Sequence, residues 1–155
     1  MKIRLAEKID INQLIQMRFD FTIEDNDTRT FHESEFESFK LECQNFLEKA
    51  IGSDTWFIWI AEEGEKIVSH IYIELIQKVP RPGRITYPFA YMTNVYTIKE
   101  YRNKGIGSKL IRTINEWVIN NKYEFIIVWP SDDSINYYQK NGFKLCKEPM
   151  EFFYS

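Results

Sequence analysis

The chain has 155 residues, of which 44% are hydrophobic and 16% aromatic, so it corresponds to a single domain, 1–155, that buries roughly two-thirds of its unfolded surface. Its formal net charge of −3 argues against a nucleic-acid-binding protein, which would carry a basic face. No apolar stretch has membrane-spanning length and the opening residues lack a signal-peptide core, so we expect a cytoplasmic protein with no membrane partner.

The first half of the chain predicts one strand followed by two helices. A short strand covers residues 2–6. Asp10 followed by Gln13 predicts a capped helix start, and Ser34 followed by Glu37 predicts a second one. Apolar residues at helical spacing continue each pattern and predict one buried face per helix.

A hairpin and a loop follow the second predicted helix. Residues 56–61 and 66–77 are rich in β-branched and aromatic side chains, and the charged turn Glu62–Glu65 separates them. This order is typical of a β-hairpin. Residues 78–84 contain two prolines and a glycine and predict a loop.

A glycine-rich segment, Arg102–Ser108, lies between a predicted strand at 90–97 and an amphipathic helix. Such a turn leaves several backbone N–H groups free at a helix start, where the helix dipole favours a phosphate-bearing ligand. The spacing does not fit a P-loop, and Leu110 stands where a dinucleotide fingerprint needs its third glycine. The alternative is a turn whose glycines serve geometry alone.

A second segment follows the apolar run 125–129, which predicts a strand buried on both faces. Ser131 or Asp132 is placed to cap a short helix that Gly142 ends. We expect a last hairpin through Pro149.

The chain has few residues suited to metal binding. Its only cysteines are Cys43 and Cys146 and its only histidines are His32 and His70, without the spacing of a metal site, so we expect no metal. Cys43 lies on the apolar face of a predicted helix and Cys146 in a predicted late strand. Both are expected to be buried thiols in a reducing compartment.

Two motifs connect these segments to a known family. The first is Arg or Gln, two residues, Gly, one residue, and Gly or Ala, and it is matched by Arg102, Gly105 and Gly107. The second is an aromatic residue, Tyr, three residues and Gly-Phe, and it is matched by Tyr137, Tyr138, Gly142 and Phe143. Over about its last two-thirds, the chain therefore resembles the GNAT N-acetyltransferase superfamily.

This resemblance implies an α/β fold. The central sheet would be mixed and mostly antiparallel, with helices on both faces, and would be splayed between its fourth and fifth strands. Acetyl-CoA, the acyl donor, would lie in that opening with its pantetheine arm paired to strand backbone.

The resemblance also implies which residues hold acetyl-CoA. The backbone of Val95, Tyr96 and Thr97 would bind the pantetheine and orient the thioester. Backbone N–H groups would hold the pyrophosphate, from Arg102, Asn103, Lys104, Gly105, Ile106, Gly107 and Ser108. Ser131 and Ser134 stand where the family usually has Asn and Ala, and Ser131 can still donate to pantetheine.

Tyr138 would act as the general acid that protonates the departing coenzyme A thiolate. Its alternative is a core aromatic, and Tyr137 is assigned to packing. Some relatives carry a glutamate where this chain has Tyr91, so the general base is open. The candidates are Glu74 and Asn94, the latter acting through water.

The sequence therefore predicts an acetyl-CoA-dependent N-acetyltransferase that acts on a primary amine of a small molecule or peptide by direct attack in a ternary complex. The alternatives are a non-catalytic acyl-CoA-binding sensor and an acetyltransferase of protein amines.

The acceptor amine is expected to bind between the first two helices and the late hairpin. The acidic segment that contains Asp20, Glu24, Asp25 and Asp27 is either a mouth that attracts a cationic amine or a solvated loop. The apolar end Met150–Tyr154 either completes the sheet or forms a homodimer contact.

Overall fold

A computed structural model describes residues 1–26 and 29–154 of the chain. It contains one five-stranded sheet, in the order β1-β2-β3-β4-β5. The strands are β1 (Lys2–Leu5), β2 (Trp56–Glu63), β3 (Lys66–Ile76), β4 (Phe89–Thr97) and β5 (Ile126–Val128). The helices are α1 (Ile11–Asp25), α2 (Glu33–Ala50), α3 (Ile106–Asn120) and α4 (Ile135–Lys140). Among the described residues, no helix combines the length and apolar character needed to cross a membrane.

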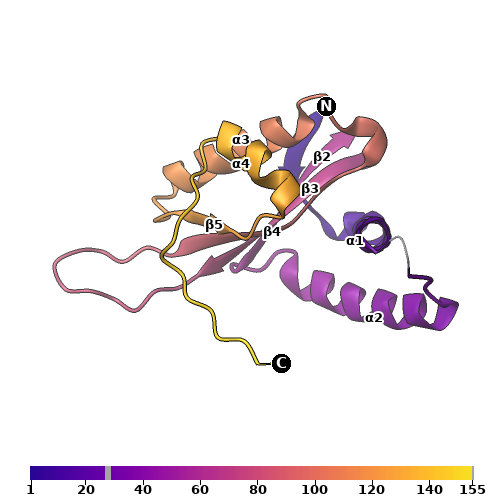
Figure 1. Cartoon of the computed structure of the whole chain (residues 1–155), viewed down its shortest axis with the longest axis horizontal. Coiled ribbons are helices and arrows are strands. Elements are labelled where there is room, and N and C mark those ends of the chain that lie inside the picture. Colours follow the sequence, from indigo (N-terminus) through magenta and orange to yellow (C-terminus); the bar gives the residue numbers. More distant parts are fainter. Residues whose placement is uncertain (27–28, 155) are drawn as a thin grey trace.

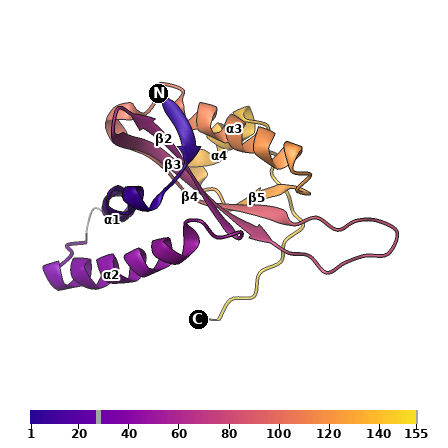
Figure 2. The same cartoon turned by 180° about the vertical axis from the view of Figure 1, so that it is seen from behind.

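The sheet is antiparallel except at its last pair. Strands β1 to β4 pair antiparallel in sequence order, whereas β4 and β5 run parallel. Helices α1 and α2 cover one face and α3 and α4 the other (Figures 1 and 2). The predicted mixed α/β fold with helices on both faces is confirmed.

Alternation along β2 divides the interior into two cores. Ile58 and Ile60 pack against α1 and α2, while Phe57 and Trp59 pack against α3. This period of two places successive side chains on opposite faces of the sheet. The apolar stripe of α3 is fully buried at Leu110, Ile111 and Ile114.

The pairing of β4 with β5 is short and opens the sheet. Only Ala90, Tyr91 and Met92 of β4 have partners on β5. Beyond Met92 the two strands separate, and the second half of β4 has neighbours on its β3 side alone.

A bulge in β4 lies just beyond this point. His70 pairs with Tyr96 and Tyr72 pairs with Thr93, so two residues, Asn94 and Val95, oppose one residue of β3. Asn94 has a φ of +51°. The fully buried His70 contacts the Asn94 carbonyl through Nδ1 at 2.8 Å, and because burial lowers the pKa of His70 to about 4, its neutral ring donates this hydrogen bond.

The predicted helix starts are correct in place but not in their caps. The Asp10 carboxylate does not cap α1; it accepts from the backbone N–H of Glu7 and from Arg4, because a 3₁₀ turn at Lys8–Asp10 precedes the helix. Gln13 instead bonds backbone groups across the sheet edge, at Glu65 and Ile67.

The cap of α2 lies two residues before the predicted one. His32 is the N-cap residue, and Glu35 accepts from its backbone N–H at 2.8 Å, so the predicted pair of Ser34 and Glu37 is wrong. Both pairs have the three-residue spacing of a capping box, and the structure uses the earlier one.

The predicted last hairpin is wrong. Residues 143–154 contain neither strand nor helix and run past β5 as an extended tail (Figure 1). Pro149 has no N–H to donate to a ladder. β5 is therefore a half-buried edge strand rather than a strand buried on both faces. The expectation that both cysteines are buried is also wrong, because Cys146 on the tail is exposed and Cys43 on α2 is half-buried. The expectation that the apolar end completes the sheet fails, and a homodimer contact stays a prediction.

Candidate functional site

A cleft of about 750 Å³ lies where β4 and β5 separate. The second half of β4 forms its floor, and its walls are the start of α3 on one side and the segment from Trp129 into α4 on the other. The bulge at Asn94 and Val95 bends the floor strand at this place. The cleft therefore exposes strand backbone that has no sheet partner on the β5 side.

The turn into α3 forms one end of the cleft. Gly105 precedes the helix with a φ of +78°, a conformation that side chains rarely tolerate. The helix then leaves its first backbone N–H groups without partners inside the helix, at the positive end of its dipole. This end of the cleft is suited to a phosphate group.

Gly107 lines the cleft and packs tightly against Tyr137. A Cβ built on it would lie 3.2 Å from the hydroxyl of Tyr137. That hydroxyl donates to the carbonyl of Gly107 at 2.8 Å and so ties α4 to α3. Tyr137, expected to be packing alone, makes a specific link across one wall of the cleft.

The cleft brings most of the predicted site residues together. Those that line it are Asn94, Val95, Tyr96, Thr97, Arg102, Asn103, Gly105, Ile106, Gly107, Ser108, Ser131, Ser134 and Tyr138. Two predicted residues are not among the lining. Lys104 instead lies over the ring of Tyr101, with 5.3 Å between its Nζ and the ring centroid. Glu74 lies on β3 between Trp56 and Tyr91, and it does not line the cleft although Tyr91 does.

Arg102 lies at the rim of the cleft and is already bonded. Its Nε donates to the Thr97 carbonyl at 2.8 Å, and its Nη2 donates to the Glu24 carboxylate at 2.6 Å. The Tyr96 hydroxyl also donates to Glu24, at 2.7 Å. Burial alone would raise the pKa of Glu24, but these hydrogen bonds outweigh it and lower that pKa below its ordinary value.

Among the described residues, the acidic segment does not line the cleft, and its role as the mouth of an acceptor site stays a prediction. Glu24 holds Arg102 and Tyr96, and Asp20 accepts from Gln16 at 2.9 Å. Neither of them, nor Asp25, lines the cleft or the pocket that borders it. Asp27 lies outside the described residues.

Tyr138 lies deep in the wall formed by α4. It is 6% exposed and packs against Tyr137 and Phe143, with centroid distances of 5.0 and 5.5 Å. Burial raises its pKa to about 12, so its hydroxyl keeps its proton throughout the neutral range. It is therefore a hydrogen-bond donor in contact with the cleft.

A second pocket, of about 730 Å³, borders the cleft beside α2. The two hollows share Arg18, Thr93 and Asn94. The rest of the second pocket is lined by α2 and the neighbouring face of the sheet, at Ser34, Glu35, Ser38, Phe39, Glu42, Cys43, Phe46, Trp56 and Tyr72. We call it the α2 pocket.

Sequence reasoning missed the α2 pocket. Phe39, Cys43 and Phe46 recur at helical spacing, which predicts a buried helix face, yet Phe46 remains 39% exposed. A helix that lines a pocket shows the same spacing of apolar residues as a helix that faces the core. The excess of large aromatic residues on this face was the available indication.

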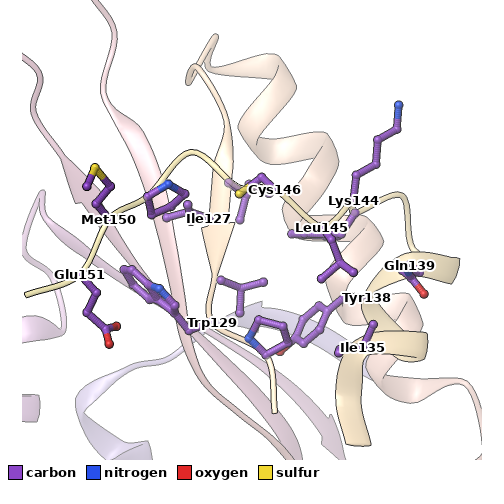
Figure 3. A pocket seen from close by; sticks show the side chains of 15 residues that line it. Ile127, Trp129, Ile135, Tyr138, Gln139, Lys144, Leu145, Cys146, Met150 and Glu151 are labelled. Carbon is purple, nitrogen blue, oxygen red and sulfur yellow. The ribbon is translucent and has the colours of Figure 1, made fainter. Parts of the chain in front are cut away.

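A third hollow, of about 390 Å³, lies between β5, α4 and the tail. Trp129 and Tyr138 line it from the fold, and Leu145, Cys146 and Met150 line it from the tail (Figure 3). Tyr138 thus lines both this hollow and the cleft, as do Val128, Trp129 and Pro130.

Residues 1–26 and 29–154 contain no group of three or more His, Cys, Asp or Glu side chains placed to hold a metal ion.

A sequence model of the Acetyltransferase (GNAT) family matches residues 19–143. No curated protein sequence matches the chain significantly.

Solved structures with the same fold include three acetyltransferases. One is a predicted acetyltransferase from Clostridium acetobutylicum with acetyl-CoA, with a TM-score of 0.79 and 23% identity over 98% of this chain and 95% of that one. A glucosamine-6-phosphate N-acetyltransferase from Arabidopsis thaliana has a TM-score of 0.70 and 20% identity over 99% and 98%. An aminoglycoside acetyltransferase from an uncultured soil sample has 0.72 and 19% over 99% and 95%. At these low sequence identities, the similarities show only that the fold is shared.

Proposed function

Because the chain belongs to the GNAT acetyltransferase family, we propose that it transfers an acetyl group from acetyl-CoA to a primary amine by direct attack in a ternary complex. The observation that carries this proposal is the cleft between β4 and β5, which has a phosphate-suited helix start at one end and the protonated Tyr138 in its wall. The α2 pocket borders the cleft at Asn94 and supplies a place for the amine.

The acetyl-CoA roles follow from the groups that each part of the cleft offers. The strand backbone at Val95, Tyr96 and Thr97 has no strand neighbour on the β5 side, where the pantetheine amides would pair with it; the Thr97 carbonyl already accepts from Arg102. The turn at Gly105 and the first N–H groups of α3 would hold the pyrophosphate. Ser131 and Ser134 bond one another at 3.1 Å on the opposite wall, where Ser131 remains exposed to a ligand.

In the reaction, the amine nitrogen attacks the thioester carbon, a C–N bond forms, and the C–S bond breaks with its electron pair on sulfur. Tyr138 donates to that sulfur as the general acid. Its pKa of about 12 exceeds the roughly 8.5 of an ordinary thiol, so full proton transfer requires that the phenol be reprotonated. The proton released by the attacking nitrogen supplies this replacement.

Of the two base candidates, Asn94 has the better position. It lies where the cleft and the α2 pocket meet, whereas Glu74 lines neither. The side-chain amide of Asn94 is not basic enough to accept a proton at neutral pH, so Asn94 would act by orienting a water molecule that takes the proton from the amine.

The proposal is tested by thiol release from acetyl-CoA in the presence of amino acids, polyamines, aminosugars and short basic peptides, with the acetylated product identified by mass. Turnover of any class supports the enzyme. If calorimetry detects acetyl-CoA binding and no amine of the panel reacts, the chain is instead a non-catalytic acyl-CoA-binding sensor or an acetyltransferase of protein amines. If acetyl-CoA does not bind, the assignment of the cleft is wrong.

Two glycines provide a matched test of the acetyl-CoA cleft. Gly105 and Gly52 both have left-handed backbone, with φ of +78° and +83°, and an added Cβ meets nothing within 4 Å at either. Gly105→Ala and Gly52→Ala should each lower the free energy of unfolding by about 1–2 kcal/mol, through the same backbone strain.

Only Gly105→Ala should also weaken acetyl-CoA binding, by several-fold, because relaxation of the strain tilts the N–H groups of the α3 start. Urea unfolding and calorimetry measure the two effects. Equal acetyl-CoA affinity in the two variants would show that the turn at Gly105 does not bind the cofactor.

A further inference from the structure

We propose, on the basis of the function above, that the acceptor is an amino acid with an aromatic or large apolar side chain, acetylated at its α-amino group and held by Arg18 through its carboxylate. The α2 pocket combines two features that select this class. It has an aromatic wall, and a cation stands where the pocket meets the cleft.

The aromatic wall is built from α2 and the sheet. Phe46 and Trp56 meet edge to face with ring centroids 5.1 Å apart, and Phe39 and Tyr72 continue the surface. Phe46 remains 39% exposed, so part of this apolar surface is open. Aromatic surfaces of this kind bind an apolar side chain by burying area and by ring contacts.

Arg18 lies at the inner end of the pocket. It lines both the α2 pocket and the acetyl-CoA cleft, beside Asn94, whose side-chain oxygen accepts from its guanidinium at 3.4 Å. None of the described carboxylates forms an ion pair with it. A half-buried guanidinium without an acidic partner is complementary to a ligand carboxylate, which it binds with two parallel hydrogen bonds.

The charged side chains that line the α2 pocket are Arg18, Glu35 and Glu42. Glu35 accepts from Arg29 and from the His32 backbone, and Glu42 lines the pocket from an exposed position on α2, so Arg18 is the charged group at the boundary with the cleft. The only charged side chain shared with the acetyl-CoA cleft is Arg18, which repels an additional ammonium group near the reacting nitrogen. An amino acid places its carboxylate on Arg18 and its amino group one carbon away, at the junction with the cleft.

The step is a simple acyl transfer. The α-nitrogen attacks the thioester carbon, a C–N bond forms and the C–S bond breaks, and the proton lost from nitrogen balances the one gained by sulfur. The products are an N-acetyl amino acid and free coenzyme A.

The test compares L-phenylalanine with L-phenylalaninamide and 2-phenylethylamine, which keep the ring and amine but lack the carboxylate, and with spermidine and glucosamine. We expect kcat/KM for phenylalanine to exceed the values for all four by about 10–100-fold, the range of one charge-assisted hydrogen-bond pair. Arg18→Gln should remove this advantage over the amide. Arg112→Gln, an exposed arginine of α3, is the matched control and should not.

A second variant tests the aromatic wall. Phe46→Ala should raise KM for phenylalanine by about tenfold while changing KM for glycine little, because glycine has no side chain to place there. Preferential turnover of spermidine or glucosamine, unaffected by Arg18→Gln, would overturn the inference and leave the proposed acetyltransferase intact.

Calorimetric binding of phenylalanine to the protein separates the two proposals if no amine reacts. Binding that Arg18→Gln abolishes would support the amino-acid site even when acetyl transfer fails. No binding in the wild-type protein, with or without coenzyme A, would overturn the site.

Discussion

Replacing Tyr138 with phenylalanine is expected to lower kcat by about 10²–10⁴-fold while acetyl-CoA affinity changes little, which is the range for loss of a general acid. The ring packs against Tyr137 and Phe143 and would stay in place, since only the hydroxyl is removed. Steady-state kinetics and calorimetry measure the two quantities. Tyr123→Phe is the matched control, because Tyr123 is a half-buried tyrosine that packs on Trp117, away from the cleft.

The pH dependence gives a second readout for Tyr138. Its protonated form is the active one, so activity that depends on it is lost only as pH rises through its pKa of about 12. Below about pH 10, Tyr138 should therefore produce no fall in kcat. A wild-type fall in that range that disappears in Tyr138→Phe would contradict the raised pKa. A kcat within threefold of wild type in the variant would exclude the general-acid role.

Replacing Arg4 with methionine is expected to lower the free energy of unfolding by about 3 kcal/mol at pH 7, as when one partner of a buried ion pair is removed. Arg4 donates to both oxygens of Asp10, at 2.8 and 3.0 Å, and to Glu62, at 2.9 Å. Asp10 is 4% exposed. Methionine fills a similar volume but leaves the Asp10 charge buried with the Glu7 backbone N–H as its remaining donor in this cluster.

The effect should depend on pH with a definite sign. Burial alone would raise the pKa of Asp10, yet its hydrogen bonds with Arg4 and Glu7 lower it below its ordinary value. The ion pair therefore stabilises the fold above the unfolded pKa near 3.9, and this stability is lost as pH falls through the folded pKa. In the variant, Arg4 no longer offsets the cost of burying the charged Asp10 carboxylate, and protonation of Asp10 at low pH removes this cost.

Urea unfolding at about pH 7 and about pH 3.5 measures this difference. The gap between wild type and Arg4→Met should narrow at the lower pH, and Arg112→Met, at an exposed site, should change stability by less than about 0.5 kcal/mol at both. A gap of the same size at the two pH values would mean that lost packing, not the ion pair, is the cause.

Local patterns were enough to predict most of the regular structure. The alternation of β2 and β3 and the charged turn between them predicted the hairpin, where Gly64 takes a left-handed φ of +61°. The stripe of α3 and the glycine before it predicted both the helix and its start. These features depend on residues within a few positions of one another, and backbone geometry alone relates them.

The wrongly predicted final hairpin shows where local patterns fail. Residues 143–154 are rich in apolar side chains, as strands are, yet Met150 and Phe152 are 98% and 91% exposed. Apolar content predicts a tendency to be buried, but it does not say which strand edge will be available for pairing. Fixed register is decided by the partner strand.

The sequence by itself determined the family, through the two motifs around Gly105 and Tyr138, and the order of the elements that carry them. Only the tertiary structure decided the partners of Arg4, which lie 6 and 58 positions away, and the link from His70 to the bulge at Asn94. It alone placed Glu24 on Arg102 and opened the α2 pocket beside Arg18. Each of these contacts joins residues on different elements, and it exists only once strand register and helix packing have brought them within a few ångströms.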